Sequence, residues 1–158
     1  MTVNFEPAVL ALADRLRARG VLLAAAESCT GGLIAAACTS VAGSSDWFER
    51  GFVTYSNEAK TEMLGVPAAL IAAHGAVSEP VARAMVEGAL RHSHATLAVA
   101  VTGIAGPGGA VPGKPVGTVW LAWGTAGAVS TELLQLGGDR SAVRAATVAT
   151  ALARLNAA

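Results

Sequence analysis

Residues 21–38 read VLLAAAESCTGGLIAAAC, and they are the most informative part of the sequence about the fold class. The first six residues are apolar without alternation, which is typical of a short strand buried on both of its faces. The turn Thr30-Gly31-Gly32 then opens a second apolar run, from Leu33 to Cys38, that predicts a helix. The stretch therefore predicts a strand, a polar loop and a helix in direct succession.

Helices and strands alternate on both sides of this unit. Helical patterns cover residues 7–19, closed by Gly20, segments that begin near Ser56 and Pro67, and residues 78–91 and 139–155. Strand patterns cover residues 51–55, 95–101, 116–123 and 128–136. This order predicts an α/β fold, a three-layer α/β/α sandwich, and the closing hairpin predicts a mixed, mostly parallel sheet. The 158 residues suit one core, so we expect a single domain over residues 1–158.

The charge balance argues against nucleic acid as a partner. Lysine and arginine together number 11, as do aspartate and glutamate, so the net charge is zero. The chain contains no basic cluster that could neutralise a run of phosphates. A protein without net charge also meets little repulsion from its own copies, so we expect a homo-oligomer.

The sequence predicts neither an export signal nor a membrane segment. The stretch from Met1 to Pro7 lacks a basic start followed by an apolar run, and no later stretch of about 18 residues is free of polar breaks. The two cysteines, Cys29 and Cys38, suit reduced thiols better than a structural disulfide. We therefore expect a cytoplasmic protein with no membrane partner.

Polar loops follow three predicted strands, at residues 27–32, 55–60 and 102–107. Ligands of α/β sheets bind beyond the strand ends, so these loops are expected to converge on one crevice. The third loop opens a Gly- and Pro-rich segment, residues 103–115, which is too long to be an incidental connection.

A serine and a lysine offer the first candidate chemistry. Ser44 and Ser45 follow a glycine in a turn, and Lys60 comes fifteen residues after Ser45, at the start of a predicted helix. A serine needs a base to become a nucleophile, and a lysine can serve when burial or a helix N-terminus lowers its pKa. Tyr55, the only tyrosine, could relay a proton or orient Lys60. The alternative is a capped turn, a solvated lysine and a core tyrosine.

Backbone N–H groups in two loops are candidates for holding a phosphate or an oxyanion, since helix N-termini favour negative charge. The residues concerned are Ser28, Thr30, Gly31 and Gly32 in the first loop, and Thr102, Gly103 and Gly106 in the second. Arg140 begins the last helix, where a bound anion would offset its unfavourable position, and Arg144 lies one turn further on. The alternatives are tight turns and solvated arginines.

A rival nucleophile is Cys29 with His74 as its base, although nothing in the sequence places the two together. His92 and His94 are two residues apart at a predicted helix end and do not face one another. The sequence therefore predicts no metal site and no cofactor.

Six segments read together resemble the CinA C-terminal domain family, and the similarity covers nearly the whole chain. The segments are residues 26–32 (AESCTGG), 42–45 (AGSS), 51–60 (GFVTYSNEAK), 74–78 (HGAVS), 102–107 (TGIAGP) and 114–119 (KPVGTV). The family fold is a three-layer α/β/α sandwich with a mixed sheet, in agreement with the pattern of elements above.

The resemblance implies an amidohydrolase that converts nicotinamide mononucleotide to nicotinate mononucleotide and ammonia in pyridine nucleotide salvage. Family members look like serine–lysine amidases, which implies Ser45 as nucleophile, Lys60 as base and Tyr55 as the assisting tyrosine, with Ser44 an open alternative to Ser45. Thr102 and Arg140 match positions implicated in the substrate site. Two alternatives remain, a nucleotide-binding regulatory module without catalysis and an amidase for another small carboxamide.

Overall fold

The computed structural model describes residues 3–158; Met1 and Thr2, which begin the segment considered above for an export signal, lie outside the described residues. The helices are α1 (Glu6–Arg19), α2 (Leu33–Cys38), α3 (Asn57–Leu64), α4 (Ala68–His74), α5 (Glu79–Arg91) and α6 (Arg140–Ala157), with a short 3-10 helix at Ser44–Asp46. The strands are β1 (Leu23–Glu27), β2 (Phe48–Val53), β3 (Leu97–Gly103), β4 (Thr118–Thr125) and β5 (Ala128–Gln135).

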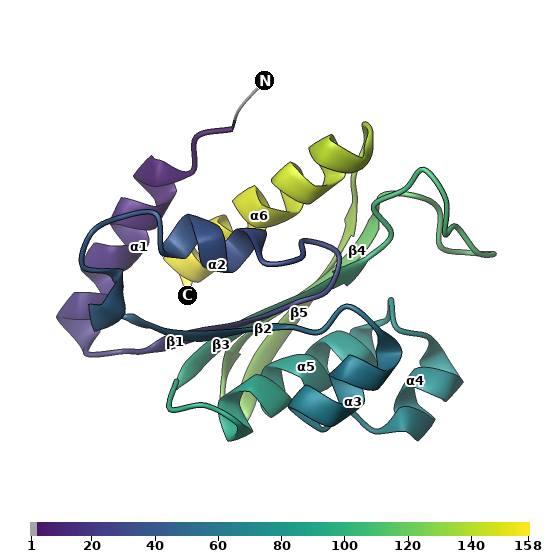
Figure 1. Cartoon of the computed structure of the whole chain (residues 1–158), viewed down its shortest axis with the longest axis horizontal. Helices are drawn as coiled ribbons and strands as arrows, with labels where there is room; N and C mark the ends of the chain where they lie inside the picture. The colour runs from purple at the N-terminus through teal and green to yellow at the C-terminus, as the bar shows by residue number, and fades with distance from the viewer. Residues whose placement is uncertain (1–2) are drawn as a thin grey trace.

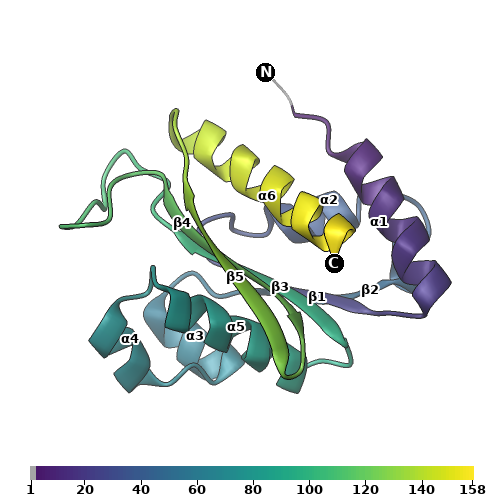
Figure 2. The same cartoon turned by 180° about the vertical axis from the view of Figure 1, so that it is seen from behind.

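The elements form three layers. Helices α1, α2 and α6 cover one face of the sheet, and α3, α4 and α5 cover the other (Figure 1, and from behind in Figure 2). The strand order is β2-β1-β3-β4-β5. Strand β1 pairs in parallel with β2 and β3, whereas β4 pairs antiparallel with β3 and β5. The predicted α/β/α sandwich with a mixed sheet is confirmed.

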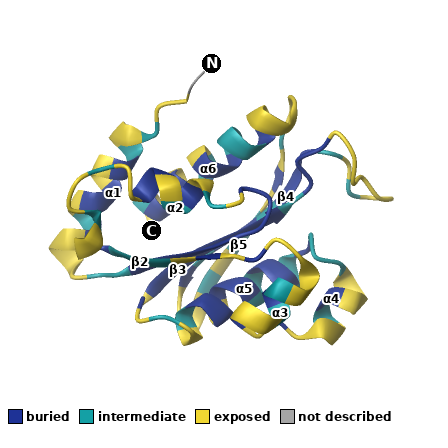
Figure 3. Cartoon of the chain, viewed as in Figure 1, coloured by how far each residue is buried: buried dark blue, intermediate teal, exposed yellow. Residues whose placement is uncertain are grey.

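The central strands separate two apolar cores. Leu23 and Ala25 of β1 face the core under α1, α2 and α6, whereas Ala24 and Ala26 face the core under α3, α4 and α5. Both faces of β1 are therefore buried, as the dark blue centre of Figure 3 shows, which explains why its sequence is apolar without alternation. Within the layer of α3, α4 and α5, Gly88 of α5 lets two helices approach closely, since an added Cβ would lie 2.1 Å from a backbone oxygen of α3.

Most predicted elements are present, and the bounds of α2 are those predicted. The largest shift is in β2, which begins at Phe48 although the sequence predicted a start at Gly51. The sequence pattern missed these first residues because Glu49 and Arg50 are charged. Because β2 is an edge strand, the two side chains remain partly exposed and form an ion pair at 2.7 Å.

The parallel strands bring three loops to one edge of the sheet. Glu27 at the end of β1 pairs with Val53 of β2 and Val101 of β3, so the loops that follow all three strands begin side by side. The crevice predicted beyond the strand ends therefore has the right position for a site.

Within the described residues, no helix is both long and apolar enough to cross a membrane.

Candidate active site

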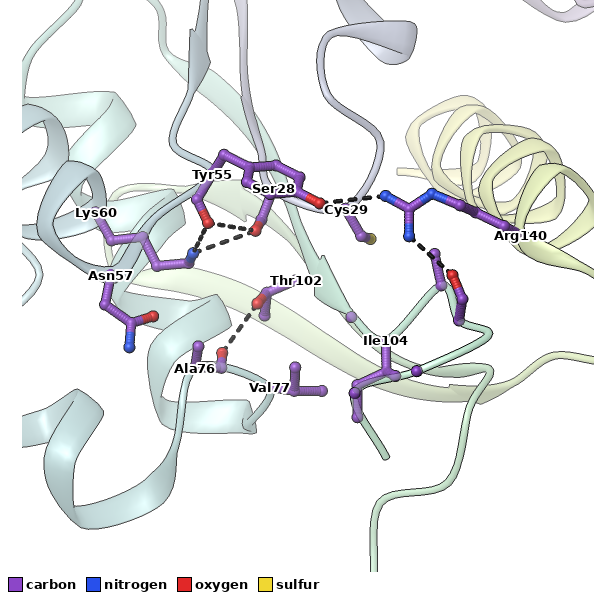
Figure 4. A pocket seen from close by; sticks show the side chains of 15 residues that line it. Ser28, Cys29, Tyr55, Asn57, Lys60, Ala76, Val77, Thr102, Ile104 and Arg140 are labelled. Atoms are coloured by element: carbon purple, nitrogen blue, oxygen red, sulfur yellow. Dashed lines mark hydrogen bonds between the residues drawn. The ribbon is translucent and has the colours of Figure 1, made fainter. Parts of the chain in front are cut away.

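A cavity of about 260 Å³ lies at this edge of the sheet, and Figure 4 shows the side chains around it. Its polar lining comes from four places in the chain. Ser28 follows β1, Tyr55 and Lys60 follow β2, Thr102 lies near the end of β3, and Arg140 begins α6. The predicted convergence of the three loops is confirmed, and α6 completes the wall.

Lys60 is buried at the bottom of this arrangement, with 1% of its surface exposed. Ser56 caps α3 by accepting a hydrogen bond from the Ala59 N–H, and Lys60 follows in the first turn. The Lys60 Nζ donates to Ser28 Oγ at 3.1 Å, to the Thr54 carbonyl at 3.0 Å and to the Tyr55 carbonyl at 3.2 Å. No ion pair to Lys60 occurs in residues 3–158, and burial lowers the pKa of its amine below the ordinary value of 10.5.

Ser28 is held in place by the loop between β1 and α2. Its N–H donates to the Val101 carbonyl at 3.1 Å, and its carbonyl accepts from the Gly31 N–H at 3.0 Å. The C=O and N–H of a trans peptide point in opposite directions, so the Cys29 N–H is directed away from this turn. Across residues 3–158 this Cys29 N–H donates a hydrogen bond to no other residue, and within its own residue it lowers the pKa of the thiol. A donor not bound to another residue therefore lies directly after the Ser28 hydroxyl.

The buried Glu27 side chain fixes the other end of the loop. One of its oxygens accepts from Thr30 Oγ1 at 2.5 Å and from the Ile34 N–H at 2.8 Å, and the other accepts from the Ala35 N–H at 3.0 Å. These contacts satisfy N–H groups in the first turn of α2, which an isolated short helix would leave free. The loop that carries Ser28 is thereby rigid at both ends.

Arg140 and Tyr55 form the mouth of the cavity. Arg140 donates through Nη1 to the Gly106 carbonyl at 2.9 Å and through Nη2 to the Tyr55 phenol at 3.2 Å. The phenol therefore points toward Arg140, as Figure 4 shows, and the contact of Tyr55 with Lys60 is made by its backbone carbonyl. Within the described chain Arg140 has no ion-pair partner, so its charge is available to a ligand.

The structure does not bring Ser45 to Lys60. Ser44 and Ser45 lie in the 3-10 helix before β2, and Ser45 is exposed, whereas Lys60 follows the opposite end of β2. Six residues of strand span about 20 Å, far beyond contact between the two side chains. The spacing of fifteen residues between Ser45 and Lys60 gave no sign of this separation, because a whole strand lies within it. Ser28, expected only to bind substrate, is the serine that contacts Lys60; its position directly after a buried strand was the available signal.

The remaining candidates divide between the cavity and its supports. Gly103 and Gly106 line the cavity, and so does Asn57, which the sequence analysis did not single out. Thr102 lines it too and donates to the Ala76 carbonyl at 2.9 Å. Thr30, Gly31 and Gly32 instead shape the loop behind the cavity, with φ of 57° at Gly31 and 107° at Gly32.

The rival pair Cys29 and His74 is not assembled. His74 is exposed at the end of α4 and does not line the cavity. Burial raises the pKa of the Cys29 thiol to about 11, which keeps it protonated at neutral pH. Within residues 3–158 no cluster of histidine, cysteine and carboxylate side chains is suited to holding a metal ion.

Comparison with known proteins agrees with the fold and covers the whole site. The sequence model of the CinA C-terminal domain matches residues 6–158. Nicotinamide-nucleotide amidohydrolase PncC of Pseudomonas putida is 57% identical over 141 residues, which are 89% of this chain and 88% of that protein. The protein of the same name from Escherichia coli K12 is 55% identical over 89% of this chain and 86% of its own length.

A solved structure is also similar to this chain in three dimensions. The crystal structure of competence/damage inducible protein CihA from Agrobacterium tumefaciens superposes with a TM-score of 0.95 at 46% identity, covering 99% of this chain and 96% of that one. The resemblance noted in the sequence is thus confirmed along nearly its whole length. The chain belongs to the CinA C-terminal domain family.

Proposed function

We propose that this protein hydrolyses the carboxamide of nicotinamide mononucleotide, giving nicotinate mononucleotide and ammonia in cytoplasmic pyridine nucleotide salvage. The observation that carries the proposal is the buried contact of 3.1 Å between Lys60 Nζ and Ser28 Oγ, in a chain whose relatives include proteins named nicotinamide-nucleotide amidohydrolase. Ser28 is the proposed nucleophile in place of Ser45, and Lys60 is its base.

The contacts of Lys60 suit a neutral amine. A neutral amine has two N–H donors and one lone pair. The carbonyls of Thr54 and Tyr55, at 3.0 and 3.2 Å, are closer to Nζ than the Ser56 carbonyl at 3.5 Å, so they accept the two N–H groups of the neutral amine. In this form the contact with Ser28 is reversed: the hydroxyl donates its proton to the lone pair of Nζ. No carboxylate within the described residues pairs with Lys60 to hold it in the ammonium form. Burial then favours the neutral amine, as a general base requires.

The reaction follows as acyl transfer. Lys60 takes the Ser28 proton while Oγ bonds to the carboxamide carbon, and the charge that develops on the carboxamide oxygen is stabilised by the Cys29 N–H. The carbon–nitrogen bond then breaks, and the nitrogen leaves as ammonia with the proton returned by Lys60. Water cleaves the acyl-enzyme, which yields the carboxylate and restores the Ser28 hydroxyl.

Arg140 is the proposed partner of the substrate phosphate. Its guanidinium lies at the mouth of the cavity, 3.2 Å from the Tyr55 phenol, with no carboxylate paired to it in the described chain. A guanidinium matches the geometry of phosphate oxygens, so a nucleotide bound with its carboxamide beside Ser28 would place its charged end here. Thr102, on the cavity wall between these two ends, is proposed to contact the substrate as well.

The decisive experiment compares two serines. Ammonia release is measured with nicotinamide mononucleotide, nicotinamide, its riboside and the dinucleotide, using the intact protein, Ser28→Ala, Ser45→Ala and Lys60→Met. We expect release from the mononucleotide to be abolished in Ser28→Ala, to fall about 10²- to 10⁴-fold in Lys60→Met and to be retained in Ser45→Ala. Activity that survives in Ser28→Ala and is lost in Ser45→Ala would overturn the assignment of the nucleophile.

The same panel tests the wider proposal. Release of ammonia from a different amide alone would change the substrate, and tight nucleotide binding without any release would favour a regulatory module over an enzyme.

A further inference from the structure

Arg144 lies behind the loop that carries Ser28 and makes two contacts with it. Its Nε donates to the Cys29 carbonyl at 3.1 Å, and its Nη2 donates to the Thr30 carbonyl at 3.2 Å. The side chain is half-buried, and within residues 3–158 it forms no ion pair. The Arg144 guanidinium, which has no acidic partner in the described residues, thus bonds to two consecutive peptide carbonyls next to Ser28, the proposed nucleophile.

The contact with Thr30 begins a chain of hydrogen bonds. The peptide whose carbonyl accepts from Arg144 has the Gly31 N–H at its other end, and that N–H donates to the Ser28 carbonyl at 3.0 Å. The Ser28 carbonyl belongs in turn to the peptide whose N–H is that of Cys29. Three donors therefore follow one another: the guanidinium, the Gly31 N–H and the Cys29 N–H.

Such a chain has a direction. Each accepted hydrogen bond draws electrons toward the carbonyl oxygen and makes the N–H of the same peptide a better donor, so bonds in series strengthen one another. The charge of Arg144 stands at the start of the series, and the last donor, the Cys29 N–H, is the one that donates to no other residue in the described protein. The series therefore concentrates donor strength at a single group beside Ser28 Oγ.

We propose that Arg144 is a positioning residue for the reaction, which orients and polarises the Cys29 N–H as an oxyanion donor through the Gly31 and Ser28 peptides. The proposal rests on the amidohydrolase function proposed above. Arg144 does not line the cavity, so it acts through the loop and not by touching the substrate. This separates its role from that of Arg140, one turn earlier on α6, which does line the cavity.

The charge of Arg144 also acts on the neighbouring Cys29 thiol. Burial is the largest influence on this thiol and raises its pKa to about 11, and the negative charge of Glu27 raises it too, whereas the Cys29 N–H and the positive charge of Arg144 lower it. A negative charge at this position is therefore favoured by Arg144. An oxyanion beside the Cys29 N–H would be favoured in the same way.

The test replaces Arg144 by glutamine, by lysine and by alanine. Arg91→Gln is the matched control, since Arg91 also donates to a backbone carbonyl, that of Leu64 at 3.3 Å, away from the site. Because a misdirected oxyanion donor costs less than the 10²- to 10³-fold of a deleted one, we expect Arg144→Gln to lower kcat about 10- to 100-fold with KM nearly unchanged. Added guanidinium ion should restore part of the kcat of Arg144→Ala, and Arg91→Gln should retain the kcat of the intact protein.

A spectroscopic measurement separates this proposal from the proposed function. The amide proton of Cys29, followed by NMR in protein without substrate, should move upfield in Arg144→Gln, because a weaker hydrogen-bond series leaves the N–H less polarised. An unchanged Cys29 amide shift, or a kcat equal to that of Arg91→Gln, would overturn the positioning role. If the intact protein releases no ammonia, the proposed function fails while the amide shift still decides whether the series exists. If Arg144→Gln does not fold, Arg144→Lys, which keeps the charge and loses the two-point contact, supplies the same two readouts.

Discussion

Lys60 can act as the base for Ser28 only if it loses its proton well below the pH at which a lysine in water does so. Burial lowers the pKa of Lys60 from its ordinary value of 10.5. The four contacts of its Nζ, with Ser28 Oγ and with the carbonyls of residues 54, 55 and 56, are all with uncharged oxygens, so none of them supplies a counter-charge that would restore the ammonium form. We therefore predict that kcat/KM rises about tenfold per pH unit at low pH and levels off at the pKa of Lys60, below 10.5.

The same pKa must appear in the stability of the protein. Between the lowered pKa of folded Lys60 and 10.5, the unfolded chain binds one proton more than the folded chain, so the free energy of unfolding rises with pH there. The limiting slope for one proton is about 1.4 kcal/mol per pH unit. Relative to an uncharged side chain, the stability due to Lys60 is complete above 10.5 and lost as the pH falls through the folded pKa.

Lys60→Met isolates this contribution. The buried thiols act with the opposite sign, since burial raises the pKa of Cys29 to about 11 and that of Cys38 to about 12, against an ordinary value of 9.0. Their folded forms retain protons that the unfolded chain has lost, so they reduce stability above pH 9.0. Both thiols remain in Lys60→Met. The contribution of Cys38 cancels when the unfolding free energies of the two proteins are subtracted at each pH, whereas Cys29 and Lys60 each shift the pKa of the other, so the difference is read below pH 9.0, where the Cys29 thiol is protonated.

The titration can also be observed directly. The chain contains only two lysines, Lys60 and Lys114, so lysine labelled with carbon-13 at Cε gives two NMR signals, and Lys114→Arg assigns them. The Lys60 signal should titrate at the pH where kcat/KM levels off and where the stability difference stops falling. A Lys60 signal that titrates at 10.5, together with a stability difference that is flat below that pH, would refute the role of Lys60 as a base.

Three further changes test the parts around this pair. Gly88→Ala would place a Cβ 2.1 Å from the Leu64 carbonyl oxygen, so urea unfolding should show a loss of about 1–3 kcal/mol from overpacking. Glu27→Gln replaces one carboxylate oxygen, which accepts a hydrogen bond at the start of α2, with an NH2 group, which cannot accept one; it should lower thermal stability by about 1–3 kcal/mol and lower kcat as well. Tyr55→Phe removes the phenol but keeps the carbonyl bonded to Lys60, so kcat in the ammonia assay should change less than tenfold while KM rises; a loss as large as that of Lys60→Met would make the phenol a proton relay.

Most of the fold could be predicted from the sequence, because the local signals for helix ends and the apolar patterns of the buried strands indicate the same elements. Gly20 and Gly65 end helices with positive φ, and Ser56 and Asp139 begin helices by accepting a hydrogen bond from an N–H of the first turn. The apolar strands are those that bury both faces. The edge strand β2 was predicted to start three residues too late because Glu49 and Arg50 carry charges that only an exposed edge permits.

The position of the site in the fold could be predicted from the sequence, but the pair of residues in contact there could not. Loops after parallel strands must meet at one edge of a sheet, so Ser28, Lys60 and Thr102 could be expected to lie together. Which serine contacts Lys60 depends on the direction of β2. Ser45 precedes that strand and Lys60 follows it, whereas Ser28 follows the neighbouring strand β1, which runs in the same direction. Spacing along the chain contains no information of this kind.

Helix α6 links the two ends of the proposed reaction. Arg140 and Arg144 are four residues apart, so they project from one side of the helix about one turn from each other. Arg140 faces the cavity mouth and bonds to Gly106 and Tyr55, whereas Arg144 bonds to the carbonyls behind Ser28. One rigid helix thus carries both the proposed phosphate partner and the proposed polariser of the oxyanion donor. Because the two arginines share one support but contact different loops, changes at Arg140 should act chiefly on KM and changes at Arg144 chiefly on kcat. The proposed reaction requires that the charged end of the substrate and its reacting carbon be held at a fixed separation. Helix α6 serves this requirement because it fixes the distance between the positions of the two arginines.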